Sequence, residues 1–529
     1  QSNMEWLVKN TDDGAKELKK FRDNDRVRLF KQAQIPSPKP LENPAGSWKK
    51  CTAENAADFS AIAYFFGKRM QKETGVPVGL IMSAWGGTSI EIWMRQSLME
   101  KNPDTAPIVK RWKKSPVFDW KRWNDGRGMA YDIALSNVRF VSKNRGIRTL
   151  YLNEGGLGGN WESNAAEGSS ISCKGDGKKG RVSGIIAFNS WANAETRLSE
   201  SGEYDLSGYD EIRFTASGSG RFSVSLGQKS IKDYDYYSSE TFDAVLKPEK
   251  EYAVRIDSMK QGGWGRAVPF TKNAVEKFKV NIHSTTVELP QSLYNGMVSP
   301  FTRYKIKGAL WYQGENNAWR AKQYRSLIKM LIRGWRQDWG YEFPFFVVQL
   351  PNFMERKDAP GESAWAELRE AQLSALELEN TAVVPIIDLG DADDIHPRKK
   401  DPVAGRLSNA ALVMLYNKKA PVTGPLYDSH RQSRRGITVT FKNTGSGLVA
   451  RGGRLKGFEI AGEDRVFVRA RAEIKNSNSV EVSAREVKNP VAVRYAWADN
   501  PECNLYNMEG LAASPFRTDK WPGITENNY

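Results

Sequence analysis

The sequence Val78-Gly79-Leu80-Ile81-Met82, followed at once by Ser83-Ala84-Trp85-Gly86-Gly87-Thr88, decides the fold class. Its first part is a compact apolar run, which is typical of a buried parallel strand. Its second part is a glycine-containing turn, after which we expect a helix. A strand, a glycine turn and a helix in succession are typical of α/β proteins, whose sites lie at the carboxyl ends of the strands.

The same pattern extends on both sides of this stretch. Residues 26–30 are predicted to form a strand, and Thr52 is predicted to cap a helix whose apolar positions recur at helical spacing as far as Met70. After residue 294 the succession of strands and helices returns. Strands are expected at 306–312, 345–350 and 382–389, and helices at about 324–335, 363–378 and 401–416.

Between these two parts the periodicity changes from helical to a strict two-residue alternation. Apolar and polar residues alternate in short segments such as 212–216, 222–226 and 278–282, separated by Gly, Ser and Asp clusters. This pattern predicts a β-sandwich. Its candidate exposed aromatic residues fit either sugar stacking or ordinary core packing: Trp191, Tyr236, Tyr237 and Trp264.

We therefore expect an α/β domain in two parts, residues 1–145 and 291–420, interrupted by an inserted β-sandwich at 146–290. The two-residue alternation of apolar and polar residues resumes beyond Pro421, so residues 421–529 are expected to form a small all-β C-terminal domain.

The composition and the charge of the chain exclude several classes of function. The net charge is +16, and basic clusters such as 398–400 and 431–435 are interpreted as solvated surface that can also attract acidic substrates. The sequence has no nucleic-acid-binding motif and no apolar run long enough for a membrane span. Its three cysteines are too few for a disulfide scaffold and too scattered for a zinc site, so we expect no metal.

Four short stretches carry the candidate chemistry, and the first two could supply a nucleophile and its base. Ser2 lies in Gln1-Ser2-Asn3-Met4-Glu5-Trp6, and a serine becomes a good nucleophile only beside a base. His396 follows a predicted buried strand and has Asp393 three residues before it. A carboxylate in that position can orient the imidazole and stabilise its protonated form.

The other two stretches could stabilise negative charge on a carbonyl oxygen. Gly86 and Gly87 offer backbone N–H groups at a turn, and Gln313 offers a side-chain amide at the end of another strand. Each feature alone also fits a plain structural role, because glycines make tight turns and polar residues commonly end strands. Three such groups at three strand ends together favour a catalytic site.

At these stretches the chain resembles the SGNH/GDSL hydrolase superfamily, and specifically the sialate O-acetylesterase family of carbohydrate esterases. The resemblance rests on four blocks in the family's order: 1–6, 79–88, 308–315 and 395–397. It implies an SGNH-type, flavodoxin-like three-layer sandwich with a parallel sheet. In the family a glycine and a strand precede the serine block, so we expect an additional segment before Gln1.

The resemblance also implies the roles of the residues. Ser2 would be the nucleophile, His396 the general base and Asp393 the third member, with Asp394 and Asp388 as alternatives. The oxyanion hole would consist of the Ser2 N–H, the Gly87 N–H and the Gln313 side chain. No cofactor is implied, and the substrate implied is an acetylated sialic acid. Removal of O-acetyl groups would pass through an acetyl-serine intermediate.

Three alternatives stay open from the sequence. One is an acetylesterase that acts on acetylated xylan or another polysaccharide. A second is a non-catalytic glycan-binding protein built on an esterase fold, and a third is a structural β-rich surface protein. Because esterases of glycans often work outside the cytoplasm, we expect a periplasmic, secreted or lysosomal location. The substrate-binding residues and the oligomeric state are unknown.

Overall fold

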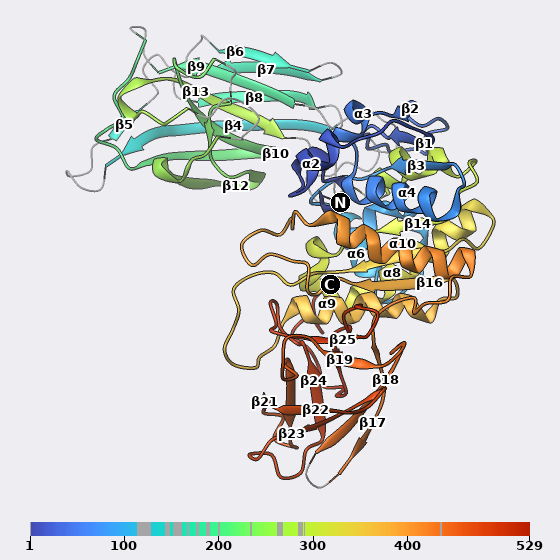
Figure 1. Cartoon of the computed structure of the whole chain (residues 1–529). Helices are drawn as coiled ribbons and strands as arrows, with labels where there is room; N and C mark the ends of the chain where they lie inside the picture. The colour runs from blue at the N-terminus through green and yellow to red at the C-terminus, as the bar shows by residue number, and fades with distance from the viewer. Residues whose placement is uncertain are drawn as a thin grey trace. The chain divides into compact units, whose positions relative to one another are not determined.

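The structure is a computed structural model (Figure 1). It describes residues 2–113, 129–142, 149–151, 161–166, 169–175, 179–186, 191–198, 202–232, 235–261, 268–283, 289, 291–433 and 436–529. The chain forms two compact units. The first unit comprises Gln1–Ile35, Pro40–Val109 and Leu293–Tyr529, and the second comprises Pro36–Lys39 and Lys110–Ser292.

The first unit begins with a three-stranded sheet in the order β2-β1-β3. Strands β1 (Asn24–Lys31) and β3 (Val78–Met82) are parallel, with Leu29 opposite Leu80, and β2 (Trp48–Cys51) runs antiparallel to β1. Helix α4 (Ala61–Thr74) packs on one face of this sheet. Gly67 lets α4 approach closely, because an added Cβ there would lie 2.5 Å from a Leu80 methyl carbon.

The helix predicted after Thr52 is two helices. Thr52 accepts a hydrogen bond from the Asn55 N–H and caps α3 (Ala53–Ala57), as the sequence predicts. Ser60 then caps α4 by accepting from the Ala63 N–H. The break arises because the Ser60 hydroxyl also donates to the Met4 carbonyl oxygen (2.6 Å), which ties the N-terminal segment to the start of α4.

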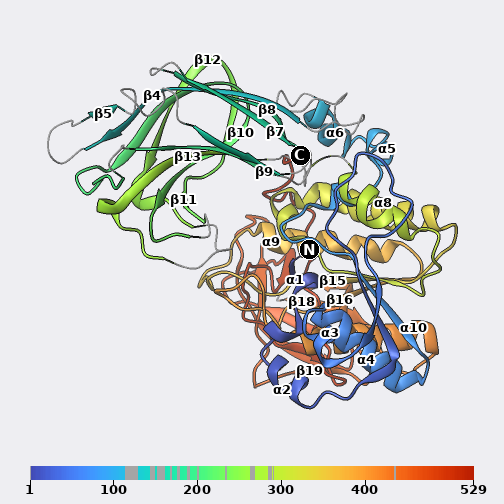
Figure 2. The same ribbon diagram turned by 90° about the horizontal axis from the view of Figure 1, so that it is seen from above.

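A second, fully parallel sheet has the order β14-β15-β16. Its strands are β14 (Ala309–Trp311), β15 (Phe345–Gln349) and β16 (Thr381–Pro385), and every residue of β15 is buried. The helices that follow these strands are α8 (Ala321–Trp339), α9 (Ala364–Leu373) and α10 (Lys400–Tyr416). Figure 2 shows α8 and α9 side by side, and Arg325 of α8 forms an ion pair with Glu370 of α9.

Short elements complete this half of the unit. They are α1 (Ser2–Glu5), η1 (Val8–Asn10), α2 (Gly14–Lys19), η2 (Ile90–Trp93), α5 (Gln96–Glu100), the first half of α6 (Ala106–Lys113, which belongs to the second unit from Lys110), η5 (Tyr294–Val298), η6 (Ser299–Phe301), η7 (Glu315–Arg320) and η8 (Ser374–Glu377). The predicted mixed α/β architecture with parallel strands is confirmed. A single flavodoxin-like sheet stays a prediction, because the described strands form two three-stranded sheets.

The C-terminal part of the same unit is rich in strands. One four-stranded sheet consists of β17 (Leu426–Gln432), β18 (Ile437–Lys442), β23 (Ser479–Ser483) and β22 (Arg471–Asn476). Another consists of β21 (Val468–Arg469), β20 (Phe458–Ala461), β24 (Ala492–Tyr495) and β26 (Phe516–Arg517), and β19 (Leu448–Ala450) pairs with β25 (Leu505–Asn507). The fully buried Arg369 of α9 donates to the carbonyl oxygens of Ala498 and Asp499, which joins this part to the helices.

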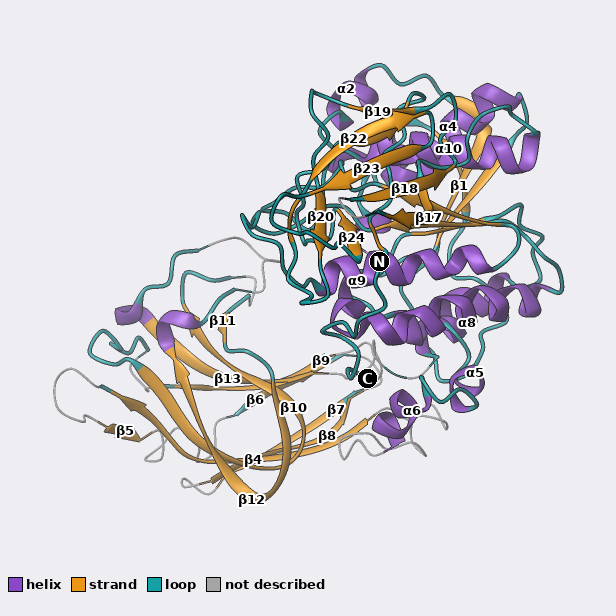
Figure 3. Cartoon of the chain, turned by 90° about the horizontal axis from the view of Figure 1, so that it is seen from below, coloured by secondary structure: helices purple, strands orange, loops and turns teal. Residues whose placement is uncertain are grey.

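The second unit is an antiparallel β structure, which Figure 3 shows largely as strands and loops. The longest of its described strands, β10 (Glu211–Gln228), pairs with four other strands and carries core residues such as Phe214, Phe222 and Val224. The range 146–290 lies within this unit, which also includes residues 110–145. Its strands are β4 (Met129–Val141), β5 (Thr149–Tyr151), β6 (Glu162–Ala165), β7 (Ser170–Gly175), β8 (Lys179–Ile186), β9 (Trp191–Arg197), β10 (Glu211–Gln228), β11 (Tyr237–Ser238), β12 (Phe242–Arg255) and β13 (Val275–His283).

The four candidate aromatic residues of this unit differ in exposure. Trp191 is exposed, whereas Tyr236 is buried beneath the ammonium group of Lys279 and Tyr237 is half-buried. Trp264 lies outside the described residues. Within the described ranges, no helix combines the length and apolar character that crossing a membrane requires.

Candidate active site

Ser2 and His396 meet in the first unit. Ser2 is the first residue of α1, and its Oγ lies 2.8 Å from Nε2 of His396, which is on the loop between β16 and α10. If the hydroxyl donates this hydrogen bond, Nε2 accepts it and Nδ1 carries the ring hydrogen. This is the arrangement in which an imidazole can remove a proton from a serine.

Side chains of the opening stretch hold Ser2 in place. Asn3 donates from Nδ2 to Glu315 Oε1 (2.8 Å) and to the carbonyl oxygen of Ile395 (3.0 Å), the residue before the histidine. The Glu5 carboxylate accepts from the Gly86 N–H (2.8 Å) and from Gln34 (2.6 Å). These contacts connect the serine, the histidine loop and the glycine turn. Gln1 lies outside the described residues.

The three candidate aspartates occupy different environments. Asp394 accepts the His396 backbone N–H (2.8 Å), and its Oδ1 lies 3.5 Å from His396 Nδ1. Asp393 is exposed, and its backbone N–H donates to Asp391. Asp388 forms a two-pronged ion pair with Arg406 at 2.6 Å. Burial opposes ionisation of Asp388, but the hydrogen bonds from Arg406 hold its pKa below the ordinary value.

The geometry therefore brings Asp394 to the histidine. Among the described residues, no hydrogen bond or ion pair joins Asp393 or Asp388 to His396.

The glycine turn lies directly against the serine. A Cβ added to Gly86 would lie 2.9 Å from Ser2 Cβ, so the turn can approach the serine this closely only because residue 86 is glycine. Gly87 has φ of +66°, a conformation that favours glycine. The Gly86 N–H donates to Glu5, whereas in the described part of the chain no hydrogen bond is formed by the Gly87 N–H.

The side-chain amide of Gln313 forms hydrogen bonds within the protein. It is 1 % exposed, and its Nε2 donates to the Thr88 carbonyl oxygen (3.2 Å) and to Asn317 Oδ1 (2.7 Å). Its Oε1 accepts from the Tyr324 hydroxyl (3.1 Å). Both amide hydrogens are thus used, and Gln313 holds the end of the glycine turn through Thr88. Donation by Gln313 to an oxyanion stays a prediction.

A buried lysine completes the site. Lys400, the first residue of α10, is 1 % exposed and donates to Asn3 Oδ1 (2.6 Å). Its ammonium group lies near the ring faces of Trp6 (5.6 Å) and Tyr312 (5.8 Å), and the Trp6 ring also stacks on His396 at 5.6 Å. Burial lowers the pKa of Lys400 to about 7, although the negative charges of Glu315 and Asp394 oppose this shift.

Two polar atoms beside this lysine are shielded from solvent. Oε2 of Glu315 and the hydroxyl of Tyr312 have no hydrogen-bond partner among the described residues. Burial raises the pKa of Glu315 and, together with the charge of Glu315, the pKa of Tyr312. Asn3, Glu315 and Lys400 thus form a polar network under the Ser2–His396 pair, which we call the Lys400 network.

A model of one protein family matches residues 1–116 and 253–406, just over half of the chain. The family is described as carbohydrate esterase, sialic acid-specific acetylesterase. The chain belongs to this family. The matched ranges of this family member include Ser2, the glycine turn, Gln313, His396 and Lys400.

The relatives of this family member are similar over parts of their length. A sialate O-acetylesterase of *Mus musculus* is 34% identical over 154 residues, which cover 25% of this chain and 28% of that protein. One of *Pongo abelii* is 28% identical over 269 residues, or 44% of this chain and 50% of that protein. The chain thus spans half or less of the length of these curated relatives.

A solved structure is similar over nearly the whole chain. It is the crystal structure of a carbohydrate acetylesterase from *Xanthomonas citri*, with a TM-score of 0.61 and 26% identity. The similarity covers 98% of this chain and 79% of that one. Both compact units of this family member therefore fall within the range of the similarity.

Sequence reasoning missed the Lys400 network. The sequence pattern predicts that the 398–400 cluster lies on the solvated surface. This prediction is wrong for Lys400, which is buried, whereas Arg398 and Lys399 are exposed. One signal was available, because a lysine in the first turn of a helix lies at the positive end of the helix dipole and needs a compensating partner. Asn3 and Glu315 are in the quoted motifs, but their mutual contact depends on the tertiary structure.

The site offers no evident metal centre. Among the described residues, no group of three or more His, Cys, Asp and Glu side chains is arranged to hold a metal ion.

Proposed function

We propose that this protein removes O-acetyl groups from a carbohydrate through an acetyl-Ser2 intermediate. The observation that carries the proposal is the 2.8 Å contact between Ser2 Oγ and His396 Nε2, with the glycine turn against the serine. Membership in the carbohydrate esterase family supports ester hydrolysis.

In the first half of the reaction, Ser2 Oγ attacks the acetyl carbonyl carbon while His396 Nε2 takes the hydroxyl proton. The N–H groups of Ser2 and Gly87 stabilise the oxyanion, and Gln313 supports the turn through Thr88. The protonated imidazole then donates its proton to the sugar oxygen, which leaves as an alcohol.

In the second half, His396 removes a proton from a water molecule, whose oxygen attacks the acetyl-Ser2 carbonyl carbon. The tetrahedral intermediate collapses, Ser2 recovers its proton from the imidazole, and acetate leaves. Asp394 is the carboxylate that orients the imidazole in this proposal, because its Oδ1 lies 3.5 Å from Nδ1.

The first candidate substrate is an acetylated sialic acid, which the description of the family supports. An acetylated neutral polysaccharide such as xylan is the second candidate, because the solved structure that is similar over nearly the whole chain is described only as a carbohydrate acetylesterase. The exposed Trp191 is a candidate contact to glycan in the second unit. An extracytoplasmic location stays part of this proposal, since acetylated glycans are abundant there.

The test is acetate release from a panel of acetylated sialic acids and acetylated xylan. We expect release from at least one substrate, and the substrate with the largest kcat/KM identifies the sugar class. Absence of release from every substrate, together with specific retention on a glycan column, would favour the non-catalytic glycan-binding alternative.

Asp394 and Asp393 are distinguished by one pair of variants. Asp394→Asn is expected to lower kcat about 10²-fold or more, because the amide keeps the contact to the His396 N–H but loses the charge facing Nδ1. Asp393→Asn is the matched control, and we expect kcat within about twofold of wild type. The reverse order in acetate-release kinetics would assign the role to Asp393.

The Lys400 network is tested with Lys400→Met. We expect a fall in kcat of about 10²-fold, because the change removes a partner of Asn3 and leaves the Glu315 charge without its buried cation. Burial lowers the pKa of Lys400 to about 7, so its ammonium loses its proton as the pH rises through that value. The part of kcat that depends on this charge should fall over the same pH range, and this fall should be missing in Lys400→Met.

Two further variants make this result specific. Lys399→Met removes an exposed charge one residue away and should leave both kcat and its pH dependence unchanged. Adding Glu315→Gln to Lys400→Met should recover part of kcat, since it removes the uncompensated carboxylate. Equal effects of Lys399→Met and Lys400→Met would refute a specific positioning role.

A further inference from the structure

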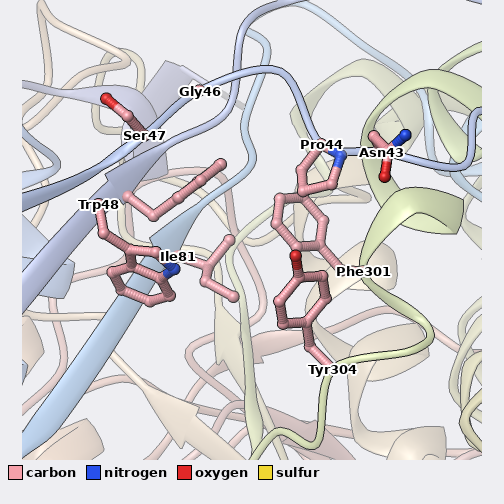
Figure 4. A pocket seen from close by; sticks show the side chains of 9 residues that line it. Asn43, Pro44, Gly46, Ser47, Trp48, Ile81, Phe301 and Tyr304 are labelled. Atoms are coloured by element: carbon pink, nitrogen blue, oxygen red, sulfur yellow. The ribbon is translucent and has the colours of Figure 1, made fainter.

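The first unit has a cavity whose lining includes none of the residues of the Ser2 site. Its volume is about 300 Å³, at the lower end of the range for small-ligand pockets. Figure 4 shows Trp48 and Ile81 on one side of it and Phe301 and Tyr304 on the other. The lining residues are Phe30, Asn43, Pro44, Gly46, Ser47, Trp48, Ile81, Phe301 and Tyr304.

The floor of this cavity is the face of the first sheet that α4 does not cover. Phe30 of β1 lies opposite both Trp48 of β2 and Ile81 of β3 in the strand register, so the three side chains share one face. Leu29 and Leu80 point to the other face, where they pack with α4. The cavity is thus built on rigid strands.

Its two outer walls are aromatic and open to solvent. Trp48 is 47% exposed and Tyr304 is 48% exposed. The indole of Trp48 lies across Gly79, where an added Cβ would be 3.1 Å from the ring, and it packs edge-on against Phe30. Tyr304 packs near Phe301, and its carbonyl oxygen accepts from Trp339 Nε1. These contacts orient the Trp48 ring and fix the backbone of Tyr304 before any ligand binds.

The polar groups around the cavity complement these rings. In the described part of the chain, the side chains of Asn43, Ser47, Trp48 and Tyr304 form no hydrogen bond with the protein. None of the nine lining residues carries a charge. A ligand with an apolar face and hydroxyl groups at its edge matches this surface. A carboxylated sugar would find no cation among the lining residues. An apolar ligand would cover the polar groups without replacing their hydrogen bonds to water.

The cavity and the nucleophile are connected by a short piece of chain. Ile81 in the floor precedes Gly86, which lies against Ser2, by five residues. Five residues span at most about 18 Å even when fully extended. Separate sugar units of one glycan chain can therefore occupy both places.

We propose that the Trp48–Tyr304 cavity binds a neutral pyranose unit of the glycan chain whose acetyl ester reaches Ser2. This inference rests on the proposed function, and it deepens it by favouring a neutral oligo- or polysaccharide over a free acetylated sialic acid. The pyranose ring stacks between the two aromatic walls, and its hydroxyl groups bond to Asn43, Ser47 and the polar atoms of the aromatic walls.

The test measures binding without any ester chemistry. Native gel electrophoresis in the presence of unacetylated xylan, unacetylated glucomannan or polysialic acid reports affinity as retardation of the whole chain. We expect retardation by at least one neutral polymer, and any retardation by polysialic acid should be the same in Trp48→Ala because it arises from the net charge of +16. Trp48→Ala should weaken binding about tenfold or more, Tyr304→Ala similarly, and Trp48→Phe should retain most of it because the aromatic wall remains.

The control is Tyr416→Ala, which removes another exposed aromatic side chain, at the end of α10, and should not change retardation. Circular dichroism confirms that each variant is folded, and Trp48→Phe supplies a conservative change if Trp48→Ala is not. Unchanged retardation of Trp48→Ala by the neutral polymers, retardation by polysialic acid alone, or none by any neutral polymer would overturn the proposal. The binding test measures no acetate, so it can refute the cavity proposal without refuting the proposed esterase activity, and the acetate-release panel can do the reverse.

Discussion

Ser2→Ala is expected to lower kcat/KM for acetate release by roughly 10⁴-fold or more. The hydroxyl oxygen of this residue lies 2.8 Å from His396 Nε2, and it is the atom that would carry the acetyl group. Removing a serine nucleophile from a Ser–His pair leaves only the rate enhancement supplied by binding and the oxyanion donors. Steady-state acetate release from the substrate identified by the panel measures the change.

A matched control is available on the glycine turn. Ser83 follows β3, and its hydroxyl donates to the Met297 carbonyl oxygen (2.8 Å), so Ser83→Ala should cost some stability but leave acetate release within a few-fold. Intact-mass analysis after rapid quenching should find an acetylated wild-type chain and an unmodified Ser2→Ala chain. Acetate release that survives Ser2→Ala would place the nucleophile elsewhere.

The meeting of Ser2 and His396 could be anticipated from the sequence, although 394 positions separate them. The family resemblance implies this pair, and the glycine turn and the histidine each follow a predicted buried strand, where α/β proteins place the loops of their sites. The mixed α/β class followed from the same strands. Their division into two three-stranded sheets did not, since pairing depends on neighbours that periodicity cannot identify.

Three features could not be predicted because each depends on a tertiary contact. The break between α3 and α4 follows from the bond of Ser60 to Met4, and helical spacing alone suggests one continuous helix. Gln313 looked free to donate, yet Thr88 and Asn317 accept both of its amide hydrogens. Lys400 looked like surface charge beside Lys399, yet it is buried against Asn3 from the other end of the chain.

His396→Ala is expected to lower kcat by about 10⁴-fold, because the imidazole both removes the serine proton and protonates the departing sugar oxygen. The lost ring stacks on Trp6 at 5.6 Å, so its removal leaves a flat space beside an aromatic face. Added imidazole can enter such a space, and we expect it to restore part of the activity. Acetate release measured against imidazole concentration, with saturation, is the readout.

The second unit supplies an unusually close control for this prediction. His283 Nε2 lies 2.8 Å from Ser223 Oγ, the same separation as in the candidate catalytic pair. Ser223 is only 2% exposed and also accepts from Asn281, which leaves its hydroxyl little access to a substrate. Burial, followed by the charge of Arg221, lowers the pKa of His283, and no glycine turn is packed against this serine in the described residues.

His283→Asn should therefore leave acetate release unchanged, and imidazole should have no effect on that variant. A Ser–His distance alone does not make a catalytic pair, because the nucleophile must also be reachable and have oxyanion donors beside it. Loss of activity in His283→Asn, or its retention within about tenfold in His396→Ala, would contradict the assignment of His396 as the general base.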